Sequence, residues 1–326
     1  MRRSLISLIS LTATVSAALA LAGCGTTQPA ADSAAPSAQR ITLTDASGAK
    51  VTLDGPAEKV VGTEWNVVES LLTLGVEPVG VADVKGYRTW DTAAPLTGSP
   101  RDIGTRGEPS TDTVASLAPD LIVATTDLPA AAVKQLRGIA PVLQVRSADA
   151  GDQIGQMREN LDLIARATGT TAEAQKAEKA FDAKVAEGRK ALADAGLGGR
   201  KLAFADGYVA SNQVTVRPYT SGSLVGAVNE AIGLETAWTV KGDASYGLAT
   251  TDVEGLSALG DVQFAYIDNN SQSDPFAEGL AKNAVWKGLP FVKKGNVHRL
   301  PDGIWMFGGH RSMRAYIDAV VDALTK

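Results

Sequence analysis

Residues 59–82 read KVVGTEWNVVESLLTLGVEPVGVA. The run begins with a short apolar segment, 59–62, and ends with another, 78–82. Between them, the apolar residues of 67–74 recur at helical spacing and stop at Gly75, a residue type favoured just after a helix. A buried strand, a helix and a second buried strand in succession predict a parallel α/β sheet.

The same alternation continues on both sides of this run. Towards the N-terminus, residues 41–53 alternate between apolar and polar around a central Ala-Ser-Gly, which predicts a β-hairpin. Towards the C-terminus, the apolar segments 121–124 and 142–145 predict two more buried strands. Helices are predicted after Ser110 and over 130–137, so the α/β pattern extends to about residue 150.

A helical segment then interrupts the pattern before it returns. Residues 152–167 and 172–195 carry apolar residues on one helical face, and the second helix would be on the order of 36 Å long. After Gly199 the sequence echoes the first half. A helix over 224–232 stops at a glycine, as 67–74 does, and a Thr-Asp pair opens another helix at residue 250. We therefore expect two Rossmann-like α/β lobes with parallel sheets, joined by a long α-helix.

The N-terminal residues predict export and a lipid anchor. Arg2 and Arg3 precede an apolar run that ends Leu-Ala-Gly-Cys24, which matches the lipobox of bacterial lipoproteins. An uncleaved transmembrane anchor is the alternative, but six Ser and Thr residues within the run disfavour it. Residues 25–39 contain no Leu, Ile, Val or aromatic residue and read as a tether. We expect Cys24 to hold the protein at the outer face of the cytoplasmic membrane. The predicted segments are a signal peptide (1–23), a tether (24–39), an N-terminal lobe (40–150), a helical connector (151–198) and a C-terminal lobe (199–326).

Composition excludes several classes of function. The chain has 326 residues, a formal net charge of −5, one cysteine and two histidines. An acidic chain does not offer a phosphate-binding surface, so we expect no nucleic-acid partner. His298 is expected in a surface turn and His310 at a helix start, in a packing or pocket-rim role, and neither belongs to a zinc motif. The sequence has no Walker-A loop, GxGxxG, GxSxG or HExxH motif, so no enzyme activity is expected.

Aromatic residues follow the predicted strands in both halves. Ligands of α/β sheets bind beyond the carboxyl ends of the strands, so these residues are candidates for a ligand cleft: Trp65, Tyr87, Trp90, Tyr246 and Trp305. Trp238 and Trp286 are expected to be packing residues. Arg106 lies between two glycines before a helix, where its guanidinium can reach ligand oxygens. The alternative for Arg106 is a surface ion pair with Glu108.

Several motifs, in order along nearly the whole chain from residue 41, resemble the ferric-siderophore-binding proteins of ABC importers, and most closely those that bind ferric hydroxamates. They are residues 62–83, Tyr87-Arg88-Thr89-Trp90, Thr105-Arg106-Gly107-Glu108-Pro109, the run WKGLPFV at 286–292 and Ile304-Trp305-Met306-Phe307-Gly308-Gly309. The resemblance implies the helical-backbone periplasmic binding protein fold and a shallow aromatic cleft for an iron chelate. The iron is carried inside the chelate, so no intrinsic cofactor or protein-bound metal is expected.

The resemblance also implies roles for individual residues. Arg106 would donate hydrogen bonds to hydroxamate oxygens near the iron, and Trp65, Tyr246 and Trp305 would line the cleft. Residues 125–127 (Thr-Thr-Asp) depart from the aromatic residues of the hydroxamate-binding group. Glu69 and Glu254, one exposed carboxylate on each lobe, would dock onto the two subunits of the permease. The protein is expected to act as a monomer.

Other ligands remain alternatives at this stage. A catecholate or carboxylate chelate is anionic and needs converging cations, for which the candidates are Arg88, Arg106, Arg217 and Arg311. Haem, which usually recruits a Tyr or His axial ligand, and cobalamin are further alternatives. A lipid-anchored hydrolase is the alternative from another class, but it would need a nucleophile and base that the sequence does not supply.

Overall fold

The computed structural model describes residues 40–210 and 213–326, which belong to one compact unit, Ala38–Lys326. The predicted signal peptide, the lipidation residue Cys24 and the tether lie outside the described residues. In the described part of the chain, no helix combines the length and the hydropathy needed to cross a bilayer.

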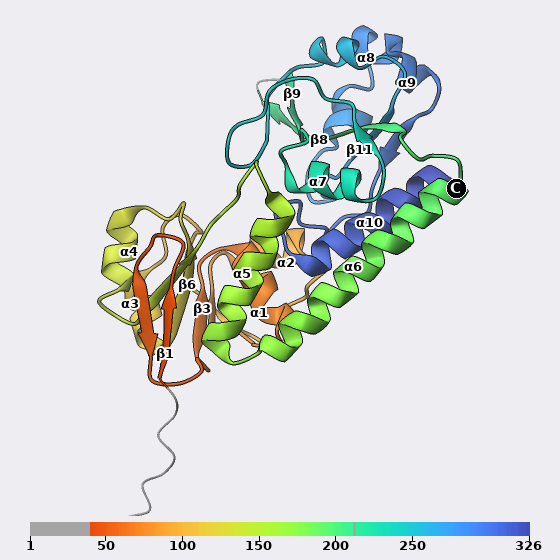
Figure 1. The fold of residues 1–326 in the computed structure, drawn as a ribbon. Helices are drawn as coiled ribbons and strands as arrows, with labels where there is room; N and C mark the ends of the chain where they lie inside the picture. Colours follow the sequence, from red (N-terminus) through yellow and green to blue (C-terminus); the bar gives the residue numbers. More distant parts are fainter. Residues whose placement is uncertain (1–39, 211–212) are drawn as a thin grey trace, which may run out of the picture. The chain divides into compact units, whose positions relative to one another are not determined.

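The N-terminal half contains a hairpin and a parallel sheet (Figure 1). The hairpin pairs β1 (Ile41–Thr44) with β2 (Lys50–Leu53) in antiparallel register, as predicted. The sheet has the order β5-β4-β3-β6-β7, and every pair in it is parallel. Its strands are β3 (Val60–Gly62), β4 (Gly80–Val81), β5 (Arg101–Asp102), β6 (Leu121–Thr125) and β7 (Val142–Val145). The strands β3 and β6 are buried throughout, which explains their uninterrupted apolar sequence.

Helices connect the strands of this sheet. They are α1 (Trp65–Thr73), α2 (Val84–Trp90), α3 (Thr111–Ser116) and α4 (Ala130–Leu136). The hydroxyl of Ser110 accepts from the backbone of Thr113 and so caps α3. Gly75, with φ of +77°, follows the C-cap of α1 in the left-handed conformation expected of it. The sequence analysis did not predict α2.

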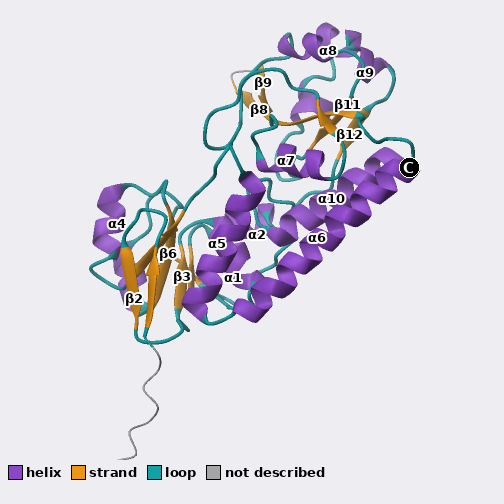
Figure 2. Ribbon diagram, in the orientation of Figure 1, coloured by secondary structure: helices purple, strands orange, loops and turns teal. Residues whose placement is uncertain are grey.

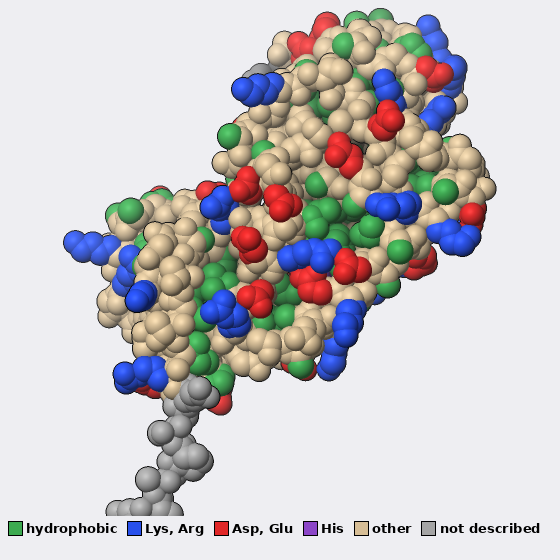
Figure 3. Space-filling model, viewed as in Figure 1, with side chains coloured by type: hydrophobic (Ala, Val, Ile, Leu, Met, Phe, Trp, Pro, Cys, Tyr) green, Lys and Arg blue, Asp and Glu red, His purple; other side chains and the backbone are tan. Residues whose placement is uncertain are grey.

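Two helices, α5 (Gln153–Thr168) and α6 (Thr171–Asp194), follow the first sheet. The long α6 contacts α1 of the N-terminal half and α7 and α10 of the C-terminal half, so it joins the two halves as predicted (Figures 1 and 2). Acidic and basic side chains lie side by side over these helices in Figure 3. Arg158 on α5 pairs with Glu178 (3.0 Å) on α6, and Lys184 on α6 pairs with Asp318 (2.8 Å) on α10.

The C-terminal half contains a second sheet of order β10-β8-β11-β12, with β9 paired to β8 in antiparallel register. Its strands are β8 (Lys201–Ala210), β9 (Gln213–Pro218), β10 (Glu235–Thr236), β11 (Gln263–Tyr266) and β12 (Val297–Arg299). Its helices are α7 (Leu224–Ala231), α8 (Ala284–Gly288), α9 (Pro290–Lys293) and α10 (His310–Thr325), with a 3₁₀ turn η1 (Gly255–Leu259) and a π turn η2 (Pro275–Gly279).

Two local expectations for this half are wrong, and a third is confirmed. The Thr250 segment leads to the short turn η1 rather than to an α-helix. His298 lies within β12, half-buried, with its Nε2 2.7 Å from the side-chain oxygen of Gln263, rather than in a surface turn. Trp238 and Trp286 are buried in the core of this half, which confirms their predicted packing role.

Candidate ligand-binding cleft

Residues from both halves line a cleft of about 500 Å³. A cavity of that volume is within the usual range for small-molecule sites. The N-terminal half contributes Glu64, Trp65, Asn66, Trp90 and Arg106, and the C-terminal half contributes Asp206, Gly207, Tyr208, Arg217, Tyr246, Leu248, Ile267, Asp268, Gln272, Trp305, Met306 and Phe307. Trp65 follows β3 and Ile267 follows β11, so the cleft lies beyond the carboxyl ends of strands in both sheets.

Arg106 lies in the loop between β5 and α3, which Gly104 shapes. Gly104 has φ of +96° and forms a bridge to Pro109, and a Cβ there would lie 3.2 Å from the carbonyl oxygen of Glu108. The Arg106 guanidinium lies 4.1 Å from the centre of the Trp65 ring and donates to Glu64 at 2.9 Å. The ion pair is therefore with Glu64 across the cleft wall and not with Glu108.

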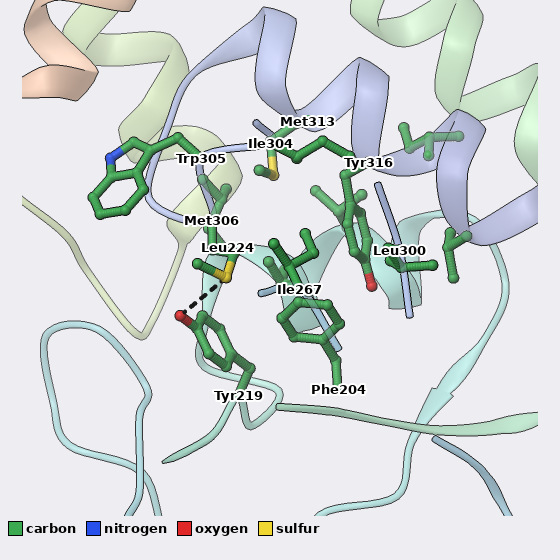
Figure 4. Close-up of a cluster of buried hydrophobic side chains, with 14 of the residues drawn as sticks. Phe204, Tyr219, Leu224, Ile267, Leu300, Ile304, Trp305, Met306, Met313 and Tyr316 are labelled. Carbon is green, nitrogen blue, oxygen red and sulfur yellow. Dashed lines mark hydrogen bonds between the residues drawn. The ribbon is translucent and has the colours of Figure 1, made fainter. Parts of the chain in front are cut away.

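Trp305 stands at the centre of an aromatic wall. Its ring centre lies 4.7 Å from that of Trp65 and 5.1 Å from that of Phe307. Figure 4 shows the Trp305 ring directed away from the buried cluster, whereas Met306 turns towards it and accepts from the Tyr219 hydroxyl at 3.5 Å. The Trp305 Nε1 atom is buried and has no hydrogen-bond partner.

A second arginine and acid pair lines the cleft from the β8–β9 hairpin. Asp206 and Arg217 are directly opposite one another on the two strands, and the Arg217 Nε donates to Asp206 at 2.8 Å. Arg217 also lies 5.5 Å from the centre of the Phe307 ring. On the same hairpin, Tyr208 lines the cleft with 52% of its surface exposed. Sequence analysis identified Arg217 only as one of four candidate cations. It did not identify Asp206 or Tyr208 as cleft residues.

Tyr246 lines the cleft and links it to the 125–127 segment. Its hydroxyl donates to Asp127 at 2.6 Å, and burial followed by this hydrogen bond raises the pKa of Tyr246. The ring centre of Tyr246 lies 5.6 Å from that of Phe307. Asp127 therefore stands where the resemblance leads one to expect an aromatic residue, and it fixes a cleft tyrosine instead of lining the cleft itself.

Tyr87 was expected to line the cleft, and the structure contradicts this expectation. Tyr87 is fully buried within α2, and its hydroxyl donates to the carbonyl of Ala94 at 2.6 Å. Burial raises the pKa of Tyr87. Its ring supports Trp65 from behind, with 6.3 Å between ring centres. Of the six predicted ligand-binding residues, the other five line the cleft.

Glu69 was expected to be exposed, and this expectation is also wrong. Its side chain is fully buried and accepts hydrogen bonds from the start of α10: the backbone N–H groups of Gly309 (2.7 Å), Arg311 (2.9 Å) and Ser312 (2.9 Å), and the Ser312 hydroxyl (2.8 Å). A carboxyl group is well placed at a helix N-terminus because it satisfies free N–H donors and opposes the helix dipole. Glu69 thus ties α1 to α10 across the two halves.

Two neighbouring residues, Gly308 and Asp91, complete this buried contact between Glu69 of α1 and the start of α10, which we call the joint. A Cβ at Gly308 would lie 2.2 Å from the Glu69 carboxyl, so the close approach requires glycine there. Asp91 is fully buried, and its Oδ1 lies 3.2 Å from the Ser312 hydroxyl oxygen. Burial, followed by the charge of Glu69, raises the pKa of Asp91 above its usual range. The joint therefore holds one carboxyl group that favours its protonated form.

The remaining candidate cations lie outside the cleft. Arg88 is exposed and donates to the carbonyl of Gly98, and Arg311 donates to the carbonyl of Leu72. The cleft lining therefore contains two guanidinium groups, each already paired with a carboxylate, and three carboxyl groups. Among the residues that the structure describes, no converging set of unpaired cations lines the cleft.

Metal ligation by the protein has no support in the described residues. Residues 40–210 and 213–326 contain no cluster of three or more His, Cys, Asp or Glu side chains suited to a metal ion. His310 is buried, with its Nε2 2.9 Å from Glu178, and His298 contacts Gln263, so neither histidine lines the cleft.

The model of the periplasmic binding protein family matches residues 60–303 of this chain. The chain belongs to the periplasmic binding protein family. The iron(3+)-hydroxamate-binding protein FhuD of Escherichia coli is 24% identical over 267 residues, covering 82% of this chain and 86% of that protein. The Fe(3+)-citrate-binding protein YfmC of Bacillus subtilis is 29% identical over 264 residues, covering 78% of this chain and 77% of that protein.

A solved structure supports the same assignment. The siderophore-binding protein FhuD from Vibrio cholerae, solved with bound Fe3+–Desferal, matches with a TM-score of 0.73 and 26% sequence identity. The match covers 82% of this chain and 98% of the Vibrio cholerae chain. These findings confirm the expected periplasmic binding protein fold. As a member of this family, the chain is a substrate-binding protein and not an enzyme.

Proposed function

We propose that this periplasmic binding protein captures a ferric siderophore, with a hydroxamate as its iron-binding group, and delivers it to an ABC importer. The relatives are named for hydroxamate and for citrate complexes of iron, so the names alone do not choose between them. The charge of the cleft favours a hydroxamate over the other iron-binding groups. Three hydroxamates neutralise Fe(III), whereas catecholate complexes are strongly anionic and need unpaired cations. Both cleft arginines are paired with acids.

Arg106 is placed to recognise the iron-binding group. Its guanidinium lies over the Trp65 ring, one of its nitrogens is bonded to Glu64, and its side chain is 37% exposed. The remaining N–H donors can reach hydroxamate oxygens at the cleft surface. The aromatic rings of Trp65, Trp305 and Phe307 supply the apolar contact for the body of the chelate.

The Arg106→Ala variant tests this role. Removing a charged donor from a buried polar contact typically costs about 1.5–3 kcal/mol, so we expect affinity for a ferric hydroxamate to fall about ten- to a hundredfold. Tryptophan fluorescence titration measures the change. Arg88→Ala, which removes an arginine outside the cleft, is the matched control and should bind as the unmodified protein does. An unchanged affinity in a folded Arg106→Ala variant would move the site elsewhere.

Membrane attachment and docking complete the proposal. We place the mature protein at the outer face of the cytoplasmic membrane, held through lipid on Cys24, and acting as a monomer. Glu69 is buried, so it is not available to dock onto the permease. Glu254, exposed beside η1, remains a candidate. On the N-terminal half, the counterpart of the Thr-Asp pair before η1 is Thr111-Asp112, and Asp112 is exposed in the first turn of α3.

The double variant Asp112→Ala/Glu254→Ala tests docking. Neither residue lines the cleft, so chelate binding should be retained, whereas iron uptake in cells should fall. Attraction between exposed charges acts mainly on the association rate and weakens with salt. Glu235→Ala removes another exposed acid of the C-terminal half and serves as the control. Uptake at the unmodified level in the double variant would contradict the docking assignment.

A further inference from the structure

Asp268 is a cleft residue whose carboxyl group has no role in the binding scheme above. It follows β11 by two residues, at the carboxyl edge of the second sheet, and lines the cleft with Trp90 and Gln272. The next residue, Asn269, donates from its side chain to the carbonyl of Thr89 at 2.8 Å. This bond holds the Asp268 segment against the end of α2, beside Trp90.

The Asp268 side chain is buried, and one of its two carboxyl oxygens has no partner among the described residues. The residue is 5% exposed, and its Oδ2 atom is inaccessible and accepts no hydrogen bond. Within residues 40–210 and 213–326 it forms no salt bridge. Burial raises the pKa of Asp268 above its usual range. A buried carboxyl oxygen with no partner costs free energy in the folded protein, so its presence in a residue of the cleft lining is consistent with a partner that arrives with the ligand.

The nearby cation of the chain is already in use. Arg299 lies 3.4 Å from Asp274 and 3.0 Å from Asp302, and it donates to the side-chain oxygen of Asn270 at 2.9 Å. In the cleft, Arg106 and Arg217 pair with their own acids. Asp268 is therefore the cleft carboxyl group that forms no salt bridge with an arginine of the described residues.

We propose that Asp268 is the counter-ion for a cationic group of the ligand, so that the preferred chelates are ferric hydroxamates that carry a free primary amine. The inference rests on the proposed function, because it assigns a subsite within the same cleft. An ammonium group held against the Asp268 carboxyl group forms a charge-assisted hydrogen bond and balances its negative charge. The ring of Trp90, which lines the same part of the cleft, offers a further surface to a cation.

Two chelates that differ by one charge test the proposal. Fe(III)–Desferal ends in a primary amine, and acetylation of that amine removes the positive charge while leaving the iron centre intact. We expect the unmodified protein at pH 7 to bind the amine form about ten- to a hundredfold more tightly than the acetylated form. The Asp268→Asn variant should lower this ratio to about one, chiefly by weakening the amine form. Asp261→Asn, which removes an exposed acid at the opposite end of β11, should preserve the ratio.

Each failure has a distinct signature. If the unmodified protein binds neither chelate, the proposed function is wrong and the subsite falls with it. If it binds both chelates equally, the cation subsite is wrong while the hydroxamate function stands. If the preference for the amine form persists in Asp268→Asn, the assignment is also overturned, because another group of the protein would then be binding the ammonium group. The comparison of the two chelates on the unmodified protein needs no variant to fold.

Discussion

The Glu69→Ala variant is expected to unfold about 10 °C below the unmodified protein. The substitution leaves three backbone N–H groups and one hydroxyl at the buried start of α10 without their acceptor. Losing several such bonds to one buried carboxyl group costs about 4 kcal/mol. For a chain of this length, that cost lowers the melting temperature by about 2–3 °C per kcal/mol. Thermal unfolding followed by circular dichroism measures the shift.

Two further variants distinguish the loss of the hydrogen bonds to Glu69 from a general loss of negative charge. Glu69→Gln keeps one carbonyl acceptor and should melt between the unmodified protein and Glu69→Ala. Glu159→Ala removes an exposed glutamate from α5 and should leave the melting temperature unchanged. If Glu69→Ala melts within about 2 °C of the unmodified protein, the joint between α1 and α10 contributes little to stability and our account of Glu69 is wrong.

The joint also bears on the cleft. Trp305 and Phe307 directly precede Gly308, whose backbone approaches the Glu69 carboxyl, and Trp65 lies one helical turn before Glu69 on α1. Glu69 therefore holds the two walls of the cleft in register. Near-ultraviolet circular dichroism reports on the Trp65–Trp305 pair, and we expect its signal to weaken in Glu69→Ala at temperatures where the far-ultraviolet spectrum is still native.

Local sequence patterns predicted the parts of the fold that local physics determines. The apolar runs at β3 and β6 and the largely apolar segment at β7 are buried strands, as expected. The glycines after α1 and α7 have positive φ and end those helices, also as expected. The antiparallel strand β9 and the short helix α2 were missed. The helix α2 has seven residues, which is too short for a helical period to stand out.

The predicted cleft residues were mostly right because strand ends in α/β sheets mark a binding edge. The errors came from contacts between residues far apart in the chain. Glu69 reads as a solvated acid because its partners lie about 240 residues away. Tyr87 reads as a cleft aromatic because its inward-facing helix was not recognised. No sequence spacing reveals the pairing of Glu64 with Arg106, which is made only when the two loops meet.

One signal in the sequence was available and went unused. The echo between the Thr-Asp pairs of the two halves aligns Asp112 with Asp252, two residues before Glu254, and so points to Asp112 rather than to Glu69 as the acid near that position. The Asp206–Arg217 pair was also within reach, because directly opposed residues of a hairpin place unlike charges together.

Selection between iron chelates by charge is the second large effect that we expect. The lining acids Glu64, Asp206 and Asp268 outnumber the arginines Arg106 and Arg217. A strongly anionic chelate would meet this excess of negative charge at short range, where an unfavourable unit-charge contact costs about 4 kcal/mol at an effective dielectric constant of 20. A neutral hydroxamate chelate meets no such penalty. We therefore expect at least about a hundredfold preference for ferric hydroxamate over ferric catecholate or ferric citrate.

Fluorescence titration of the purified protein at pH 7 with these three classes of chelate tests the central claim most directly. Trp65, Trp90 and Trp305 line the cleft, so a coloured iron chelate that enters it should quench tryptophan emission. Our account predicts saturable quenching by ferric hydroxamate, with a Kd at least about a hundredfold below those for ferric catecholate and ferric citrate. Tighter binding of the catecholate or citrate complex would contradict it.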